Sequence, residues 1–116
     1  MDMKRIINWF KSLFIALHKN NLEYNVIVFK RKGYDIFVPE SVVTRLQDLN
    51  YRIDLVLYKN KPSSLQVSVL EDSRYRYLGT FKKVFGIEGF IDGDICNCRT
   101  DNLIFKDKEY ERSWRN

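Results

Sequence analysis

Histidine, cysteine and proline are scarce in this chain of 116 residues, which contains one, two and two of them. The single histidine, His18, lies far along the chain from Cys96 and Cys98, and no Ser-His-Asp or Cys-His set is evident. A glycine-rich phosphate-binding loop is also absent. These absences argue against an enzyme, and we expect a protein that works by binding.

The two cysteines, Cys96 and Cys98, are separated by one residue, so a disulfide between them would be strained and we expect free thiols. They supply only two of the four ligands of a structural zinc site, and no second Cys/His pair exists. The oxygens of Asp92, Asp94 and Asn97 are an alternative set for a hard cation, but the known calcium-loop spacing is missing. We therefore predict no metal and no cofactor.

No apolar run reaches the roughly 20 residues that span a bilayer. The nearest run, residues 6–17, is interrupted by Lys11, and no small-residue cleavage site follows it. The sequence thus predicts a cytoplasmic protein that does not bind membranes.

The composition is 45% hydrophobic and 15% aromatic, as in a folded protein, and the length suits a single domain over residues 1–116. The net charge is +5, and residues 1–33 alone account for it, because the rest of the chain balances thirteen basic against thirteen acidic residues. A basic excess favours a polyanion such as nucleic acid, although a solvated basic surface is an equally simple explanation.

The pattern of apolar residues predicts an α+β fold. We expect residues 1–20 to form an amphipathic helix with one apolar stripe, made by Ile6, Ile7, Phe10, Leu13, Phe14 and Leu17. Residues 24–78 are rich in strands, and the expected strands and short helix are 24–29, 34–38, 42–49 (the helix), 51–58, 65–70 and 74–78. A short helix over 80–85 then begins the last part, residues 79–110.

Residues 86–105 read GIEGFIDGDICNCRTDNLIF. Asp92 and Gly93 predict a tight turn between two short strands, and residues 100–103 predict a helical turn that follows. We expect Asn102 to hydrogen-bond back to the backbone near this turn.

This segment resembles the ββα-metal motif of the HNH endonucleases of phages and mobile introns. The matching positions are Ile91, Asp92, Gly93, Asn97, Arg99, Asn102 and Leu103, whereas Asp94 and Cys98 replace the usual asparagines. The resemblance implies a phage-encoded protein, and it implies that the matching residues shape the turn and cap the helix.

The catalytic positions of the motif depart from the family. Active members place a metal-binding Asp and a general-base His where this chain has Gly89 and Phe90. Glycine has no ligand atom and phenylalanine cannot accept a proton, so the resemblance implies a degenerate HNH-like protein without catalytic residues.

Three basic stretches are candidates for binding phosphates of duplex DNA or of structured RNA. They comprise Lys30, Arg31 and Lys32 in a predicted turn, Arg74 and Arg76 alternating with tyrosines, and Lys82 and Lys83. A simpler interpretation of the alternating stretch has its tyrosines in the core and its arginines in solvent.

The alternative function is a phage effector or inhibitor that takes over a host protein complex of the defence, transcription or translation machinery. The balanced charge of residues 34–116 favours this interpretation, with Trp9, Trp114 or the tyrosines as exposed anchors. The sequence does not indicate which oligomeric state the protein adopts.

Overall fold

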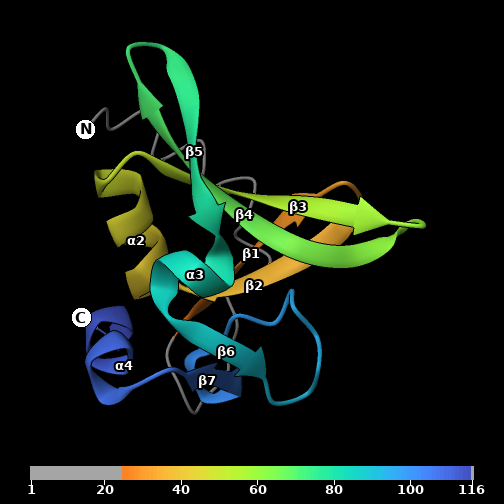
Figure 1. Ribbon diagram of the computed structural model, residues 1–116, viewed down its shortest axis with the longest axis vertical. Coiled ribbons are helices and arrows are strands. Elements are labelled where there is room, and N and C mark those ends of the chain that lie inside the picture. The colour runs from red at the N-terminus through yellow and green to blue at the C-terminus, as the bar shows by residue number, and fades with distance from the viewer. Residues whose placement is uncertain (1–24, 116) are drawn as a thin grey trace.

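The computed structural model describes residues 25–115. The expected N-terminal helix over residues 1–20, together with Trp9 and His18, lies outside the described residues. The described chain is α+β, with three short helices and seven strands in three small antiparallel sheets (Figure 1).

The elements follow one another as β1 (Val26–Arg31), β2 (Tyr34–Pro39), α2 (Glu40–Asp48), β3 (Tyr51–Tyr58), β4 (Lys61–Glu71), β5 (Arg74–Thr80), α3 (Phe81–Phe85), β6 (Ile87–Phe90), a 3₁₀ turn (Thr100–Asn102), β7 (Leu103–Phe105) and α4 (Lys108–Arg115). The strands pair as β1-β2, as β3-β4-β5 and as β6-β7. The predicted strands and helices between residues 24 and 85 are therefore present, with small shifts at their ends.

Each of the first three hairpins closes through a two-residue turn in which both residues have positive φ. These turns consist of Lys32-Gly33, Lys59-Asn60 and Asp72-Ser73, and this geometry matches the right-handed twist of the flanking strands. Two boundaries predicted from the sequence are wrong as a result. Lys30 and Arg31 belong to β1 rather than to the turn, and β4 starts at Lys61, four residues before the predicted strand.

The main core lies on one face of the β3-β4-β5 sheet. Alternate residues of these strands point into it, among them Ile53, Leu55, Leu65 and Val67, as a period of two requires. Helix α2 and the β1-β2 hairpin pack against this face. The opposite side, here called the outer face, carries the other set of alternating residues, namely Arg52, Asp54, Gln66, Ser68, Tyr75 and Tyr77.

Helix α4, which was not predicted from the sequence, brings Trp114 into the core. Its side chain is only 2% exposed and makes edge contacts with the rings of Phe81 and Phe85, at 5.7 and 5.5 Å between centroids. The indole N–H donates to the Thr100 hydroxyl at 2.9 Å. The expectation that Trp114 is an exposed anchor is therefore wrong, because this tryptophan holds α4 to the rest of the fold.

No helix within residues 25–115 has the length and the apolar character needed to cross a bilayer.

Candidate nucleic-acid interface

The segment that resembles the HNH motif forms a hairpin whose two strands are further apart in sequence than predicted. β6 pairs antiparallel with β7, and residues 91–99 between them are a loop rather than a turn followed by a strand. The second strand follows the 3₁₀ turn, and the helix of the segment is α4. The predicted helical turn at residues 100–103 is present as the 3₁₀ turn, but the strand predicted before it is absent. The observed order is strand, loop, 3₁₀ turn, strand, helix.

A network of side-chain hydrogen bonds explains why residues 91–99 stay a loop. The Asp92 carboxylate accepts bonds from the backbone N–H of Asp94 at 2.7 Å and from the side-chain amides of Asn97 and Asn102 at 2.9 and 3.0 Å. The Asn102 side chain also accepts from the Asp92 N–H at 3.0 Å and donates to the Asn97 carbonyl at 2.9 Å. Asn102 thus makes the backbone contacts expected of it, and these bonds replace a strand ladder.

The loop is also attached to the edge of β2. The Phe37 N–H donates to the Cys96 carbonyl and the Cys98 N–H donates to the Phe37 carbonyl, both at 2.8 Å. Burial raises the pKa of the Cys96 thiol to about 11 and that of Cys98 well above its usual value. Both free thiols are buried and protonated at neutral pH, so they act as small core residues. Arg99 lies over the Phe37 ring, at 5.1 Å from its centroid.

The hydrogen bonds to Asp92 make the loop sensitive to acid. They lower the pKa of its carboxyl below the usual value, and the bond from Asn97 has the largest effect. A carboxyl whose pKa is lower in the folded than in the unfolded state stabilises the fold above the unfolded pKa of about 3.9, and this stabilisation disappears as the pH falls through the folded pKa. We expect Asp92→Asn to flatten the acid limb of a plot of Tm against pH. Parallel plots for the two proteins would contradict this role.

Gly89 and Phe90, which stand where the motif that the segment resembles has its Asp and His, are part of the packing. The Phe90 ring stacks on Phe81, with 6.4 Å between centroids, and a side chain added at Gly89 would meet Ile104. Within residues 25–115, no three His, Cys, Asp or Glu side chains are placed to hold a metal ion. The hydrogen bonds between Asp92 and Asn102 hold the segment in its folded conformation.

The first predicted basic stretch divides into free and engaged side chains. Lys30 pairs with Asp35 at 2.7 Å, an exposed ion pair. Arg31 is half-buried and donates to the Ile53 carbonyl at 3.0 Å, so it links β1 to β3. Lys32, in the turn, is exposed and forms no ion pair with another described residue. Among the residues that the structure describes, Lys32 is thus the side chain of this stretch without an ionic partner.

This turn lies beside the turn between β3 and β4. The Tyr34 hydroxyl donates to the Asn60 carbonyl at 2.7 Å, which joins the two hairpin ends, and both lie on the same side of the molecule (Figure 1). Lys59 and Lys61 flank Asn60, are exposed, and have no carboxylate partner in the described part of the chain. We call this group the cationic tip. It consists of Lys30, Arg31, Lys32, Lys59 and Lys61.

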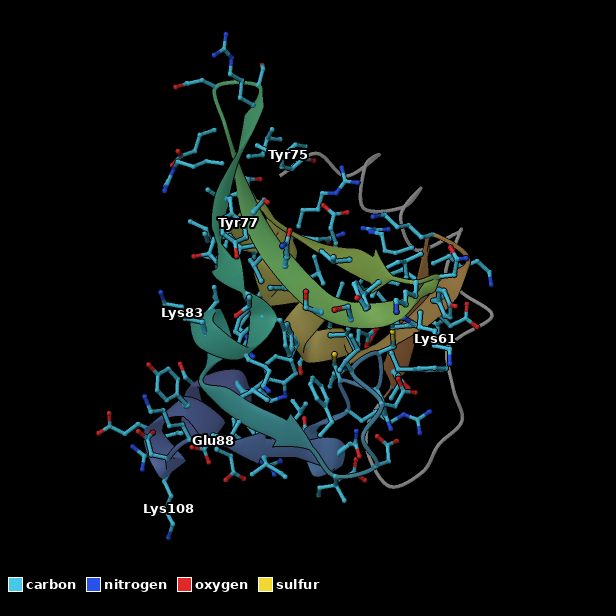
Figure 2. All side chains as sticks on the ribbon, turned by 45° about the vertical axis from the view of Figure 1, so that its right-hand side comes forward. Lys61, Tyr75, Tyr77, Lys83, Glu88 and Lys108 are labelled. Carbon is cyan, nitrogen blue, oxygen red and sulfur yellow. The ribbon has the colours of Figure 1, made fainter. Side chains whose placement is uncertain are left out.

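The other predicted cations lie elsewhere. Arg76 donates twice to the Glu71 carboxylate, at 2.9 and 3.2 Å, whereas Arg74 is exposed near the β4-β5 turn. Lys82 and Lys83 are exposed on α3. Figure 2 shows Lys83 and Lys61 on opposite sides of the molecule. The seven predicted basic residues therefore do not form one continuous surface.

Arg52, which was not among the residues predicted from the sequence, connects the cationic tip with the outer face of the sheet. The Asp54 carboxylate lies between Arg52, at 3.1 Å, and Arg31, at 3.6 Å. The Arg52 guanidinium also lies over the Tyr75 ring, at 5.2 Å from its centroid. Burial lowers the pKa of Arg31, and Arg52 lowers it further, while Asp54 and Tyr75 act against this shift. The position of Arg52 on this face could have been predicted from the alternation in β3, which points Arg52 and Asp54 outward.

Tyr75 and Tyr77 are 51% and 55% exposed. The interpretation that placed both tyrosines in the core is therefore wrong. The inward positions at this end of the sheet are taken by Tyr51 and Val69, whose neighbour on β5 is Arg76.

Comparisons of the chain with protein-family models, with curated proteins and with solved structures found no match. The likeness to HNH endonucleases stays a prediction that rests on the matched residues alone.

Proposed function

We propose that this protein is a non-catalytic nucleic-acid-binding module that holds phosphates with its cationic tip. The supporting observation is the contact between Tyr34 and Asn60, which places two basic hairpin ends side by side. Three cations follow one another in sequence at the end of the β1-β2 hairpin. The contact brings Lys59 and Lys61, at the end of the β3-β4 hairpin, next to them.

The charge balance of the cationic tip favours an anionic partner. Its five cations face two carboxylates, Asp35 and Asp54. Asp35 belongs to an exposed ion pair, which contributes little to stability and can yield to a phosphate. Asp54 instead holds Arg31 and Arg52 in place. Phosphate contacts carry no sequence information, so duplex DNA and structured RNA are both partners of this proposal.

The packing of the HNH-like segment supports a binding role without catalysis. Phe90 is committed to a ring stack with Phe81. The hydrogen bonds to the Asp92 carboxylate all come from the loop and from Asn102, so this carboxylate organises the backbone. In this proposal, β6, β7 and α4 form a ββα scaffold, carried by a phage protein, that no longer performs the chemistry.

A binding titration at several salt concentrations tests the proposal. Because each neutralised phosphate releases counterions, three to four contacts should give a slope of log K against log salt of about −2.7 to −3.6. Duplex DNA and structured RNA should behave alike, with a Kd of about 1–100 µM near physiological salt. If the wild-type protein binds neither at low salt, the proposal fails, and a host protein becomes the expected partner.

The same preparation should leave supercoiled plasmid intact in Mg²⁺ or Mn²⁺, because Gly89 and Phe90 supply neither a metal ligand nor a base. Metal-dependent nicking that Asp92→Ala abolishes would contradict the absence of catalysis.

A further inference from the structure

The outer face of the β3-β4-β5 sheet carries a row of side chains that runs straight across the three strands. Arg52 is paired with Ser68, and Ser68 is paired with Tyr77. Tyr75 lies two residues along β5 from Tyr77 and points to the same face, with Arg52 over its ring. Figure 2 shows the two tyrosines following each other along β5.

We propose that this face binds a single-stranded stretch of nucleic acid by stacking bases on Tyr75 and Tyr77. The inference rests on the proposed function, because the cationic tip supplies the phosphate contacts that bring the strand to the sheet. It names the substrate class more narrowly, as an unpaired segment of DNA or RNA.

The spacing of the two rings favours unpaired over paired bases. Alternate residues of a strand are about 7 Å apart, whereas successive bases along one strand of a duplex are about 3.4 Å apart. Neighbouring bases can therefore meet both rings only if they are unstacked, as in a single strand. Both rings are about half exposed, so each offers surface to a base without unfolding the sheet.

The groups around the rings suit a nucleotide. Ser68 and Gln66 present a hydroxyl and an amide on the same face. Ser68 lies between Arg52 and Tyr77 on the neighbouring strands. Such groups can bond the edges of splayed-out bases. The carboxylate on this face, Asp54, is held between two arginines, so it does not oppose a polyanion.

The continuity of charge with the cationic tip distinguishes this face from a general aromatic patch. The Arg52 guanidinium lies over the Tyr75 ring and shares Asp54 with Arg31, so a cationic path leads from the rings to the tip. An acidic peptide would match the charge, but it has no planar bases for the two rings. We therefore assign the face to nucleic acid and use a polyanion without bases to test it.

The experiment measures anisotropy of labelled oligo(dT) of about 12 nucleotides, of an abasic oligomer of equal length and charge, of a duplex, and of poly-aspartate. The wild-type protein should bind oligo(dT) about a hundredfold more tightly than the abasic oligomer, since only the former has bases to stack on the two rings. Tyr75→Ala and Tyr77→Ala should each weaken oligo(dT) binding about tenfold and leave binding of the abasic oligomer unchanged.

The matched controls are Tyr75→Phe and Tyr77→Phe, which keep the ring and should bind as the wild type does. The Tm of all four variants should stay near that of the wild type, because the side chains are half exposed. The inference is overturned if oligo(dT), the abasic oligomer and poly-aspartate bind equally, or if the alanine variants bind oligo(dT) as tightly as the wild type. If duplex and abasic oligomers still bind in that case, the proposed function survives; if no nucleic acid binds, both fail.

Discussion

The triple substitution of glutamine for Lys32, Lys59 and Lys61 is expected to weaken binding to duplex DNA by about two orders of magnitude at 0.1 M salt. The three side chains are exposed and have no carboxylate partner among the described residues, so their charge is available to phosphates. The slope of log K against log salt should become shallower by almost one unit for each phosphate that is no longer neutralised. Glutamine keeps much of the stem of lysine, and therefore the substitution changes charge more than packing.

The matched control removes the same charge from the other side of the molecule. Lys106, Lys108 and Arg112 are exposed on or near α4, and Figure 2 shows Lys108 far from Lys61. Their joint replacement by glutamine should leave the slope almost unchanged. Equally weakened binding in the two triple variants would mean that net charge alone, and not the cationic tip, drives binding.

Replacing Trp114 with alanine is expected to lower the free energy of unfolding by about 3–5 kcal/mol. The side chain is buried against Phe81 and Phe85, and its N–H bonds to Thr100, so the change leaves a cavity and an unpaired hydroxyl. Urea denaturation followed by circular dichroism measures the decrease. Because small domains are stable by only about 5–15 kcal/mol, the variant should be partly unfolded at physiological temperature.

The exposed neighbour Arg112 provides the control on the same helix, since its replacement by alanine should change stability by about 0.5 kcal/mol or less. Trp114→Phe should fall between the two, as it keeps an aromatic ring but removes the bond to Thr100. If Trp114→Ala unfolded at the same urea concentration as the wild type, α4 would contribute nothing to the core.

Strand β1 could be predicted from its run of β-branched and aromatic residues, and the strands of the second hairpin from their regular alternation. In β3, Ile53 and Leu55 alternate with Arg52 and Asp54, and the structure buries the first pair and exposes the second to different degrees. A period of two fixes both the strand and the face that each residue takes. The length of the turn was less evident, because Lys59-Asn60 adopts positive φ without a glycine.

The segment after Phe90 was harder to predict because side chains, rather than a backbone ladder, determine its course. Asp92 and Asn102 are ten residues apart in sequence, and their mutual bonds hold the loop closed. Local propensity favours a hairpin turn at Asp92-Gly93 and cannot anticipate a partner so far along the chain. Helix α4 was missed because its apolar pattern is short: only Tyr110 and Trp114, four residues apart, mark one face of the eight-residue helix.

The candidate interface depends on contacts between residues that are distant in sequence. Lys30, Arg31 and Lys32 were recognised as basic, but Lys59 and Lys61 join them only through the Tyr34–Asn60 bond, which spans 26 positions. Likewise, the bond from Arg31 to the Ile53 carbonyl, a contact between β1 and β3, fixes this side chain in a way that the local sequence does not show. Composition indicates a basic protein, and only the tertiary structure shows which cations lie side by side on the surface.

The most direct test of nucleic-acid binding by the cationic tip is an NMR titration of ¹⁵N-labelled protein with a short duplex DNA. The amide signals of Lys32, Gly33 and residues 59–61 should shift progressively, whereas those of residues 91–99 and of α4 should not. The shifts should diminish as salt is added, because the contacts are to phosphates. Shifts confined to α4 and the HNH-like loop, or no shifts at low salt, would contradict binding by the cationic tip.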